Sequence, residues 1–62
     1  MRKEMIEGRC NALVIALVGK ELSEKWWDSP NKFWNGETPR SVFDHDYMDV
    51  YNYLMYHADP GF

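Results

Sequence analysis

Residues 26–40, WWDSPNKFWNGETPR, hold all three tryptophans of the chain, together with one phenylalanine and two prolines. Pro30, Pro39 and the Asn35-Gly36 pair are turn-forming residues, so this segment cannot be one regular helix or strand. Its large apolar side chains must therefore either fold back into the core of a small domain or stay at the surface for a partner.

The chain is short, so burial of these aromatic side chains in the core is important for its stability. Sixty-two residues form one domain at most, which we expect to span residues 1–62. A core of this size leaves only a few kcal/mol of net stability. A single cysteine, Cys10, excludes an internal disulfide and a zinc site built from several thiolates. Aromatic side chains, which bury on the order of 150–250 Å² each, are therefore the expected anchor of the fold.

The charge pattern excludes some classes of partner. The net charge is −3, and the seven basic residues are interleaved with acidic ones, whereas a nucleic-acid surface shows clustered Lys and Arg. The apolar run at residues 12–18 is too short to span a bilayer. We therefore expect no direct binding of nucleic acid and no membrane association. A free cysteine fits a reducing compartment, so the expected location is the cytoplasm.

The first twenty residues have the apolar periodicity of a helix. Its continuous apolar face consists of Ile6, Cys10, Leu13, Val14 and Leu17. From residue 12 to residue 18 every side chain is apolar, so the second half of this helix must be enclosed by the fold or covered by another molecule. Gly19 is a natural helix stop.

Two short helices are expected in the middle of the chain. The first covers residues 22–28, with Ser23 as its N-cap, and Pro30 prevents its continuation. The second begins at TPRSVFD, with Thr38 as N-cap and Pro39 in the first helical position.

The last helix has the clearest pattern. Asp46 is its expected cap, and its apolar face consists of Tyr47, Val50, Tyr51, Leu54 and Met55. The opposite face carries Asp49, Asn52, Tyr53 and Tyr56. No segment alternates with a period of two over its length, so no strand is expected. The sequence thus predicts an all-α fold: a small compact bundle of about four helices with an aromatic-rich turn segment.

This order of features resembles the toxin-binding domain of the Xre/MbcA/ParS antitoxins. That family has the approximate pattern W-L-x-x-P-N-x-x-L-x-G-x-T-P-x-x-x-L, followed by a helix with V-x-x-x-L. The residues that match are Trp26, Pro30, Asn31, Gly36, Thr38, Pro39, Val50 and Leu54. Aromatic residues stand at positions where the family usually has aliphatic ones: Trp27, Trp34 and Phe43. The resemblance covers roughly residues 12–61.

Within this resemblance, the aromatic segment is internal scaffolding. Trp26, Trp34 and Phe43 are expected to pack in the core, while the matching Pro, Asn, Gly and Thr residues shape the turns. Adjacent tryptophans on a short helix cannot both point inward. Trp27 therefore remains open between a core position and a surface position, and for Trp34 a surface position stays as the alternative to packing in the core.

The resemblance also implies a function. Such antitoxins neutralise toxins of the RES class, which attack NAD, and their closing helix and C-terminal tail approach the cofactor pocket of the toxin. The contact residues expected here are Tyr53, Tyr56, Asp59, Pro60, Gly61 and Phe62. The alternatives are that the two tyrosines only cover the first helix and that the tail frays. Family members usually carry an N-terminal helix-turn-helix; because this chain starts near the domain boundary, we expect the partner-binding half alone.

Other functions compete with this one. The same scaffold would suit a small phage or mobile-element protein that binds and inhibits a host factor. The side chains of Ala12, Ile15 and Ala16 point away from the buried face of the first helix, which would favour a homodimer. Metal binding or catalysis by Asp44, Asp46, His57 and Asp59 is the weakest alternative, because the two first aspartates are better explained by helix termination and capping. We expect no enzyme activity, metal or cofactor.

Overall fold

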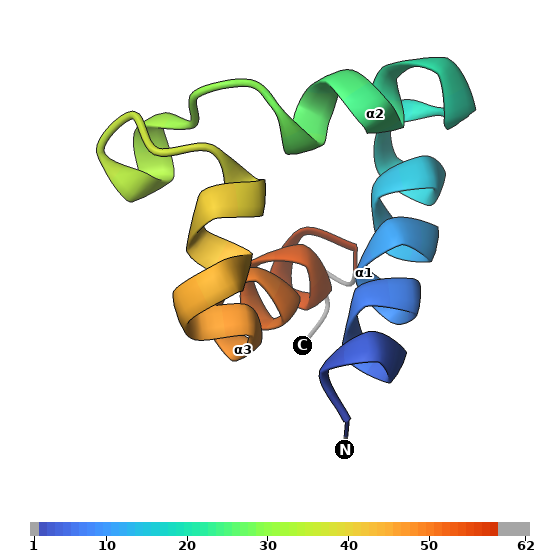
Figure 1. The fold of residues 1–62 in the computed structure, drawn as a ribbon. Coiled ribbons are helices and arrows are strands. Elements are labelled where there is room, and N and C mark those ends of the chain that lie inside the picture. The colour runs from blue at the N-terminus through green and yellow to red at the C-terminus, as the bar shows by residue number, and fades with distance from the viewer. Residues whose placement is uncertain (1, 59–62) are drawn as a thin grey trace.

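The computed structural model describes residues 2–58 of the chain, and all regular structure in this range is helical (Figure 1). The helices are α1 (Lys3–Val18), α2 (Lys20–Trp27) and α3 (Pro39–Ala58), with the short 3₁₀ helix η1 (Lys32–Trp34) between α2 and α3. The expected all-α fold is confirmed. The expected number of about four α-helices is corrected to three in the described part of the chain.

The kink in α3 explains this difference. Asp46 has φ −154° and ψ 72°, which are not helical values, and it divides α3 where we expected two separate helices to meet. Its side-chain Oδ1 accepts a hydrogen bond from the backbone N–H of Asp49 at 3.3 Å, so Asp46 caps the second half as predicted. Thr38 caps the first half, since its Oγ1 accepts a bond from the N–H of Ser41 at 3.1 Å, and Pro39 is the first helical residue.

Gly19 joins α1 directly to α2. Its φ of +91° is a conformation that suits glycine, and its N–H donates to the carbonyl of Ile15 at 2.8 Å. Its own carbonyl accepts from the N–H of Ser23 at 3.0 Å, so α2 begins at Lys20. The prediction of Ser23 as an N-cap is therefore wrong. Ser23 lies inside α2, and its hydroxyl donates to the carbonyl of Lys20 at 2.7 Å.

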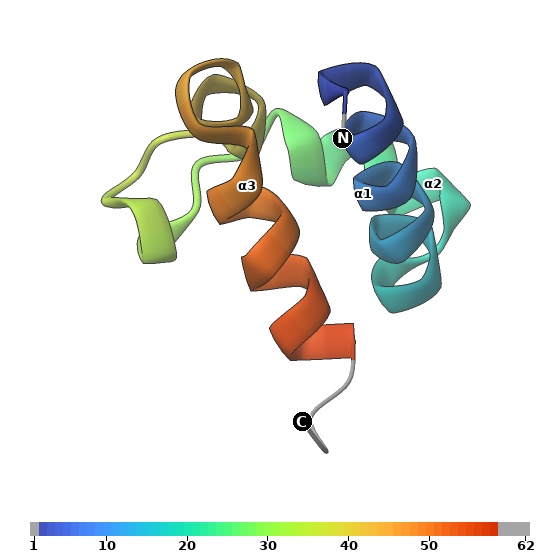
Figure 2. The same ribbon diagram turned by 90° about the horizontal axis from the view of Figure 1, so that it is seen from below.

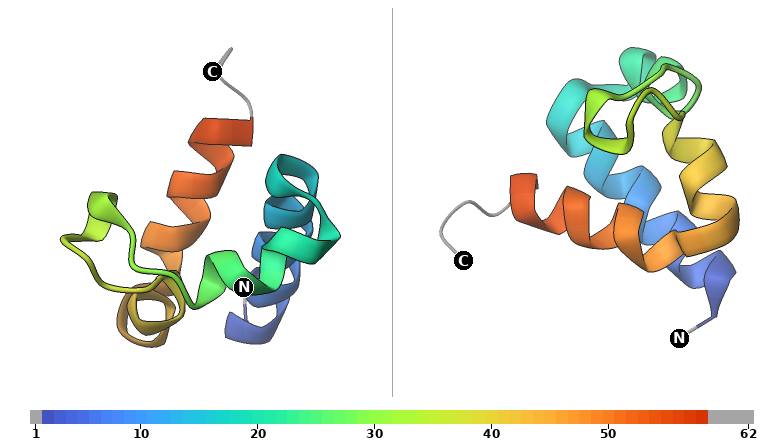
Figure 3. Two further views of the ribbon diagram at one scale, coloured as in Figure 1. Left: turned by 90° about the horizontal axis from the view of Figure 1, so that it is seen from above. Right: turned by 90° about the vertical axis from the view of Figure 1, so that its left-hand side faces the viewer.

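Asn31 organises the turn that contains η1. Its side-chain Oδ1 accepts a hydrogen bond from the N–H of Phe33 at 2.9 Å, and its backbone bonds to Gly36 and Glu37 at 3.0 Å each. Asn35 and Gly36 complete the turn with φ values of 56° and 88°. This network supports the architectural role that the sequence assigned to Asn31 and Gly36, and it carries η1 to the side of the molecule away from α1 (Figures 1 and 3).

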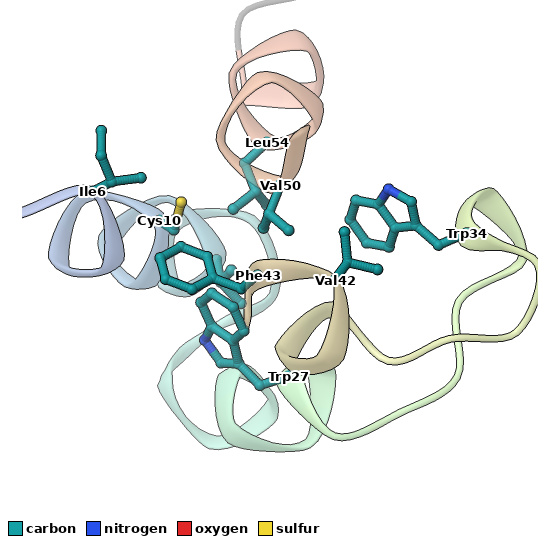
Figure 4. Packing of buried hydrophobic residues seen from close by; sticks show 9 residues of the cluster. Ile6, Cys10, Trp27, Trp34, Val42, Phe43, Val50 and Leu54 are labelled. Carbon is teal, nitrogen blue, oxygen red and sulfur yellow. The ribbon is translucent and has the colours of Figure 1, made fainter. Parts of the chain in front are cut away.

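The core is formed where α1, α2 and both halves of α3 meet. Beyond the kink, the second half of α3 packs against α1 (Figure 2). Figure 4 shows how the side chains of the core converge from these helices and from η1. The buried hydrophobic residues are Ile6, Cys10, Val14, Trp27, Trp34, Val42, Phe43, Val50 and Leu54. Trp34, Phe43, Val50 and Leu54 are thus in the core as predicted, and Pro39 is buried as well, whereas Pro30 is exposed in its turn.

Candidate partner-binding surface

The two adjacent tryptophans of α2 point in different directions. Trp27 is 7% exposed, packs edge-on against Phe43 with ring centroids 5.7 Å apart, and donates its Nε1–H to Oδ1 of Asn11 at 3.3 Å. Trp26 is only partly buried and stacks on Tyr53 at 6.4 Å. Successive helical residues lie about 100° apart, so only one indole can enter the core. The sequence placed Trp26 in the core and left Trp27 open. The structure corrects this, because Trp27 is the more deeply buried of the two.

Tyr53 is the centre of a second group of rings, outside the core. Its ring centroid lies 4.7 Å from that of Phe33, 4.8 Å from that of Trp34 and 4.4 Å from that of His57. Tyr56 extends the group, at 5.4 Å from His57. We call this group the aromatic surface; it consists of Trp26, Phe33, Tyr53, Tyr56 and His57, and the buried Trp34 lies beneath it.

Two members of the aromatic surface are open to solvent. Phe33 is 61% exposed and Tyr56 is 70% exposed. The turn around Asn31 fixes Phe33, and the second half of α3 fixes Tyr56. Phe33 was missed at the level of sequence. The signal for it was present, because Phe33 and Trp34 are adjacent in a tight turn and only one of them can point inward.

The expected contact residues can now be placed. Tyr53 packs against Trp26, Phe33 and Trp34, which come from α2 and η1, and against His57 in its own helix. Tyr56 projects into solvent. The remaining expected contacts, Asp59, Pro60, Gly61 and Phe62, lie outside the described residues.

The residues expected to support a homodimer are all exposed. Ala12, Ile15 and Ala16 lie at the surface of α1, with Ile15 at 36%. Leu17 was expected on the buried face but is 42% exposed, because so few helices cannot cover an α1 that is apolar all round in its last turns. Val18 and Leu22 are also exposed, so the junction of α1 and α2 forms an apolar patch.

Three of the residues considered for metal binding or catalysis, Cys10, Asp44 and Asp46, have contacts within the fold, while Asp59 lies outside the described residues. Burial, with a smaller contribution from the charge of Glu7, raises the pKa of Cys10 from 9.0 to about 11, so the thiol stays protonated at neutral pH. Asp44 lies 3.7 Å from the ammonium of Lys3, and Asp46 is a helix cap. Within residues 2–58, no three His, Cys, Asp or Glu side chains gather in a way that would hold a metal ion.

Two further observations concern the chain as a whole. Over the described range, none of the helices combines the length and the apolar character needed to cross a membrane. Comparisons with protein-family models, with curated proteins and with solved structures found no match to this chain.

Proposed function

We propose that this chain is a non-catalytic, antitoxin-like module that binds a protein partner through its aromatic surface. The observation that carries the proposal is the exposure of two rings that join Tyr53: Phe33 packs on it directly, and Tyr56 reaches it through His57. Large aromatic side chains left in water in a small protein are costly for solubility and typical of interfaces. Aromatic residues are also enriched among the residues that contribute most to binding energy.

The aromatic surface is preorganised for binding. Three neighbouring rings hold Tyr53 in place, and Asn31 fixes the backbone of Phe33. Side chains that are already ordered lose little conformational entropy when a partner docks. Tyr56 combines an apolar ring with a solvated hydroxyl, which suits the rim of a protein–protein interface.

The resemblance to the Xre/MbcA/ParS antitoxins favours a RES-type toxin as the partner. The second candidate is a host factor, bound by a small phage or mobile-element protein through the same surface. Both candidates use the second half of α3, and the proposed contact continues into residues 59–62. The module works without cofactor, and the cytoplasm is its proposed setting, because the buried thiol of Cys10 is compatible with a reducing compartment.

A homodimer is a separate proposal, supported by the apolar patch at the junction of α1 and α2. Ile15, Val18 and Leu22 are 36%, 37% and 54% exposed there. Sedimentation equilibrium of the wild type and of Ile15→Lys/Leu22→Lys tests it. A dimer that is lost in the variant is the expected result, and a monomeric wild type at high concentration would contradict it.

The partner-binding proposal is tested by removing the exposed rings without touching the core. The variant is Phe33→Ala/Tyr56→Ala, and the control is Met5→Ala, which removes a side chain that is 54% exposed on α1, away from the aromatic surface and from the junction of α1 and α2. Tyr53 is left intact because it supports the packing of Trp34. In one arm, each variant is co-expressed with a RES-type toxin and growth is followed. In the other, each variant is used to capture proteins from the lysate of the native cell.

The expected result is that the Phe33→Ala/Tyr56→Ala variant loses toxin neutralisation or loses one captured protein, while the control variant behaves like the wild type. Circular dichroism must show that both variants remain folded. If the ring-deletion variant and the wild type neutralise and capture equally well, the aromatic surface is not the site of binding.

A further inference from the structure

A groove runs along the other side of Trp27, between α1, α2 and the first turns of α3. Its volume is about 590 Å³, which lies in the range of ligand-binding clefts. On α1 it extends from Glu4 to Ile15, a helical distance of about 16 Å at 1.5 Å per residue. A groove of this length accommodates a segment of polypeptide. None of the residues of the aromatic surface lines it.

The charges that line the groove are unbalanced. Four carboxylates face two cationic side chains, Lys20 and Arg40. Two of these groups are already paired: Nε of Arg40 lies 2.7 Å from Oδ1 of Asp28, and Oδ1 of Asp44 lies 3.7 Å from the ammonium of Lys3. Among residues 2–58, no ion pair involves the three glutamates of the groove, which are Glu4, Glu7 and Glu24. The groove therefore has a surplus of negative charge that repels an anionic ligand.

Two aromatic rings, those of Trp27 and Phe43, lie among these carboxylates, and basic side chains of the protein itself already lie against them. The guanidinium carbon of Arg40 is 5.9 Å from the ring centroid of Trp27, and the ammonium of Lys3 is 5.7 Å from that of Phe43. Cations are attracted to aromatic faces at such distances. The lining thus combines carboxylates with the small exposed parts of two largely buried rings, which matches a side chain with an apolar stem and a cationic head.

Gly8 keeps the groove open on the side of α1. A β-carbon placed at Gly8 would meet no heavy atom within 4 Å, so the space beside it is free. Gly8 lies one residue from Glu7, whose negative charge acts on Arg40 across the groove. Open space in the groove therefore lies next to Glu7, a carboxylate without an ion-pair partner in the described range.

We infer that this groove binds an arginine-bearing segment of a protein partner. Arginine fits because its planar guanidinium forms paired hydrogen bonds with a carboxylate and stacks on aromatic rings. The groove and the aromatic surface lie on different sides of α2, so the inference is independent of the antitoxin-like function and can fail without it.

The test uses a Gly-Ser peptide that carries several arginines, together with the same peptide carrying citrulline, which has the same shape and no charge. Each is titrated into the ¹⁵N-labelled protein, and the indole N–H signals are followed by nuclear magnetic resonance. The indole of Trp27 lines the groove, whereas that of Trp34 is bonded to Asp49 outside it. The arginine peptide is expected to shift the Trp27 signal and leave the Trp34 signal in place, and the citrulline peptide to shift neither.

Variants then locate the contact. Glu7→Gln is expected to weaken binding of the arginine peptide about three- to fivefold, as expected for the loss of one partly exposed ion pair. Glu21→Gln is the matched control: it removes the same charge from α2 outside the groove and should leave the affinity unchanged. Gly8→Leu, which fills the groove without altering its charge, should abolish the Trp27 shift.

Three results would overturn the inference: no shift with the arginine peptide, an equal shift with the citrulline peptide, or an equal loss of affinity for Glu7→Gln and Glu21→Gln. The last of these would mean that the peptide is attracted only by the net negative charge of the protein. Thermal unfolding of Gly8→Leu shows whether this variant keeps its fold, and Glu7→Gln, at an exposed position, provides the independent measurement.

Discussion

The Nε1–H of Trp34 donates a 3.0 Å hydrogen bond to Oδ2 of Asp49 and so ties η1 to the second half of α3. Trp34 is 7% exposed, which leaves its indole N–H little access to water. This one bond therefore positions the turn that presents Phe33, next to the helix that presents Tyr56. The aromatic surface depends on a polar contact as much as on the packing of its rings.

Replacement of Asp49 tests this relationship. Asp49→Ala leaves the indole N–H of Trp34 without its acceptor and is expected to lower the free energy of unfolding by about 1–3 kcal/mol. Asp49→Asn keeps an acceptor oxygen, so its free energy of unfolding should fall by less. Urea denaturation followed by tryptophan fluorescence measures both. Equal losses for the two variants would show that the hydrogen bond contributes nothing beyond the charge of Asp49 near the start of the helix.

Two glycines should respond to the same substitution with opposite signs. A β-carbon meets nothing within 4 Å at either Gly8 or Gly19, so steric contact does not distinguish them. Gly8 lies inside α1, where Ala is favoured by about 0.5–1 kcal/mol, so Gly8→Ala should stabilise the protein.

Gly19 has φ +91° and ψ 159°, a region that is essentially restricted to glycine, so Gly19→Ala should destabilise by about 1–3 kcal/mol. Thermal melts of the two variants beside the wild type make the comparison. Stabilisation by Gly19→Ala would mean that the junction of α1 and α2 differs from the one described.

Leu54 and Leu17 are chemically identical but occupy different environments. Leu54 is 1% exposed and Leu17 is 42% exposed. Leu54→Ala removes a fully packed side chain and is expected to cost about 2–5 kcal/mol, which is comparable with the whole stability of a protein of this size. Leu17→Ala should cost less than about 1 kcal/mol. Far-ultraviolet circular dichroism at 25 °C should find Leu54→Ala largely unfolded and Leu17→Ala folded; the reverse order would contradict the packing.

The buried thiol of Cys10 predicts a loss of stability at high pH. Burial first, and the charge of Glu7 second, raise the pKa of Cys10 from 9.0 in its ordinary state to about 11 in the folded protein. Below pH 9 the thiol is neutral in both states and contributes no pH dependence. Above pH 9 the unfolded chain releases the proton while the folded chain retains it until about pH 11. The free energy of unfolding therefore falls through this window, by up to roughly 3 kcal/mol.

Cys10→Ala isolates this contribution from the other groups that titrate at high pH. Denaturant titrations at pH 8 and pH 10.5 should show a larger drop in stability for the wild type than for the variant. The same drop in both proteins would mean that ionisation of Cys10 is not linked to unfolding.

Much of the fold follows from local signals in the sequence. The caps at Thr38 and Asp46 and the glycine stop at Gly19 are short-range features, and all three are present in the structure. The boundary at Asp46 was predicted correctly, but the sequence does not show that the two helices on either side join into one kinked element. That outcome depends on how both halves pack on α1 and α2, which no local pattern encodes.

The candidate site was predictable only in part. Periodicity placed Tyr53 and Tyr56 on one helical face, but it does not say which ring meets another element. Which of Trp26 and Trp27 is buried in the core depends on where η1 and α3 lie relative to α2. The groove beside Trp27 brings together residues of three helices, from Glu4 on α1 to Asp44 on α3, so its surplus of carboxylates is visible only in the folded protein.

The most direct test of the proposed function is hydroxyl-radical footprinting of the protein, free and in complex with its captured partner or toxin. We expect oxidation of Phe33 and Tyr56 to be suppressed in the complex, while Met5, which is 54% exposed on α1, reacts as fast as in the free protein. Unchanged oxidation of Phe33 and Tyr56, with suppression at Met5, would place the partner elsewhere and contradict the proposed binding surface.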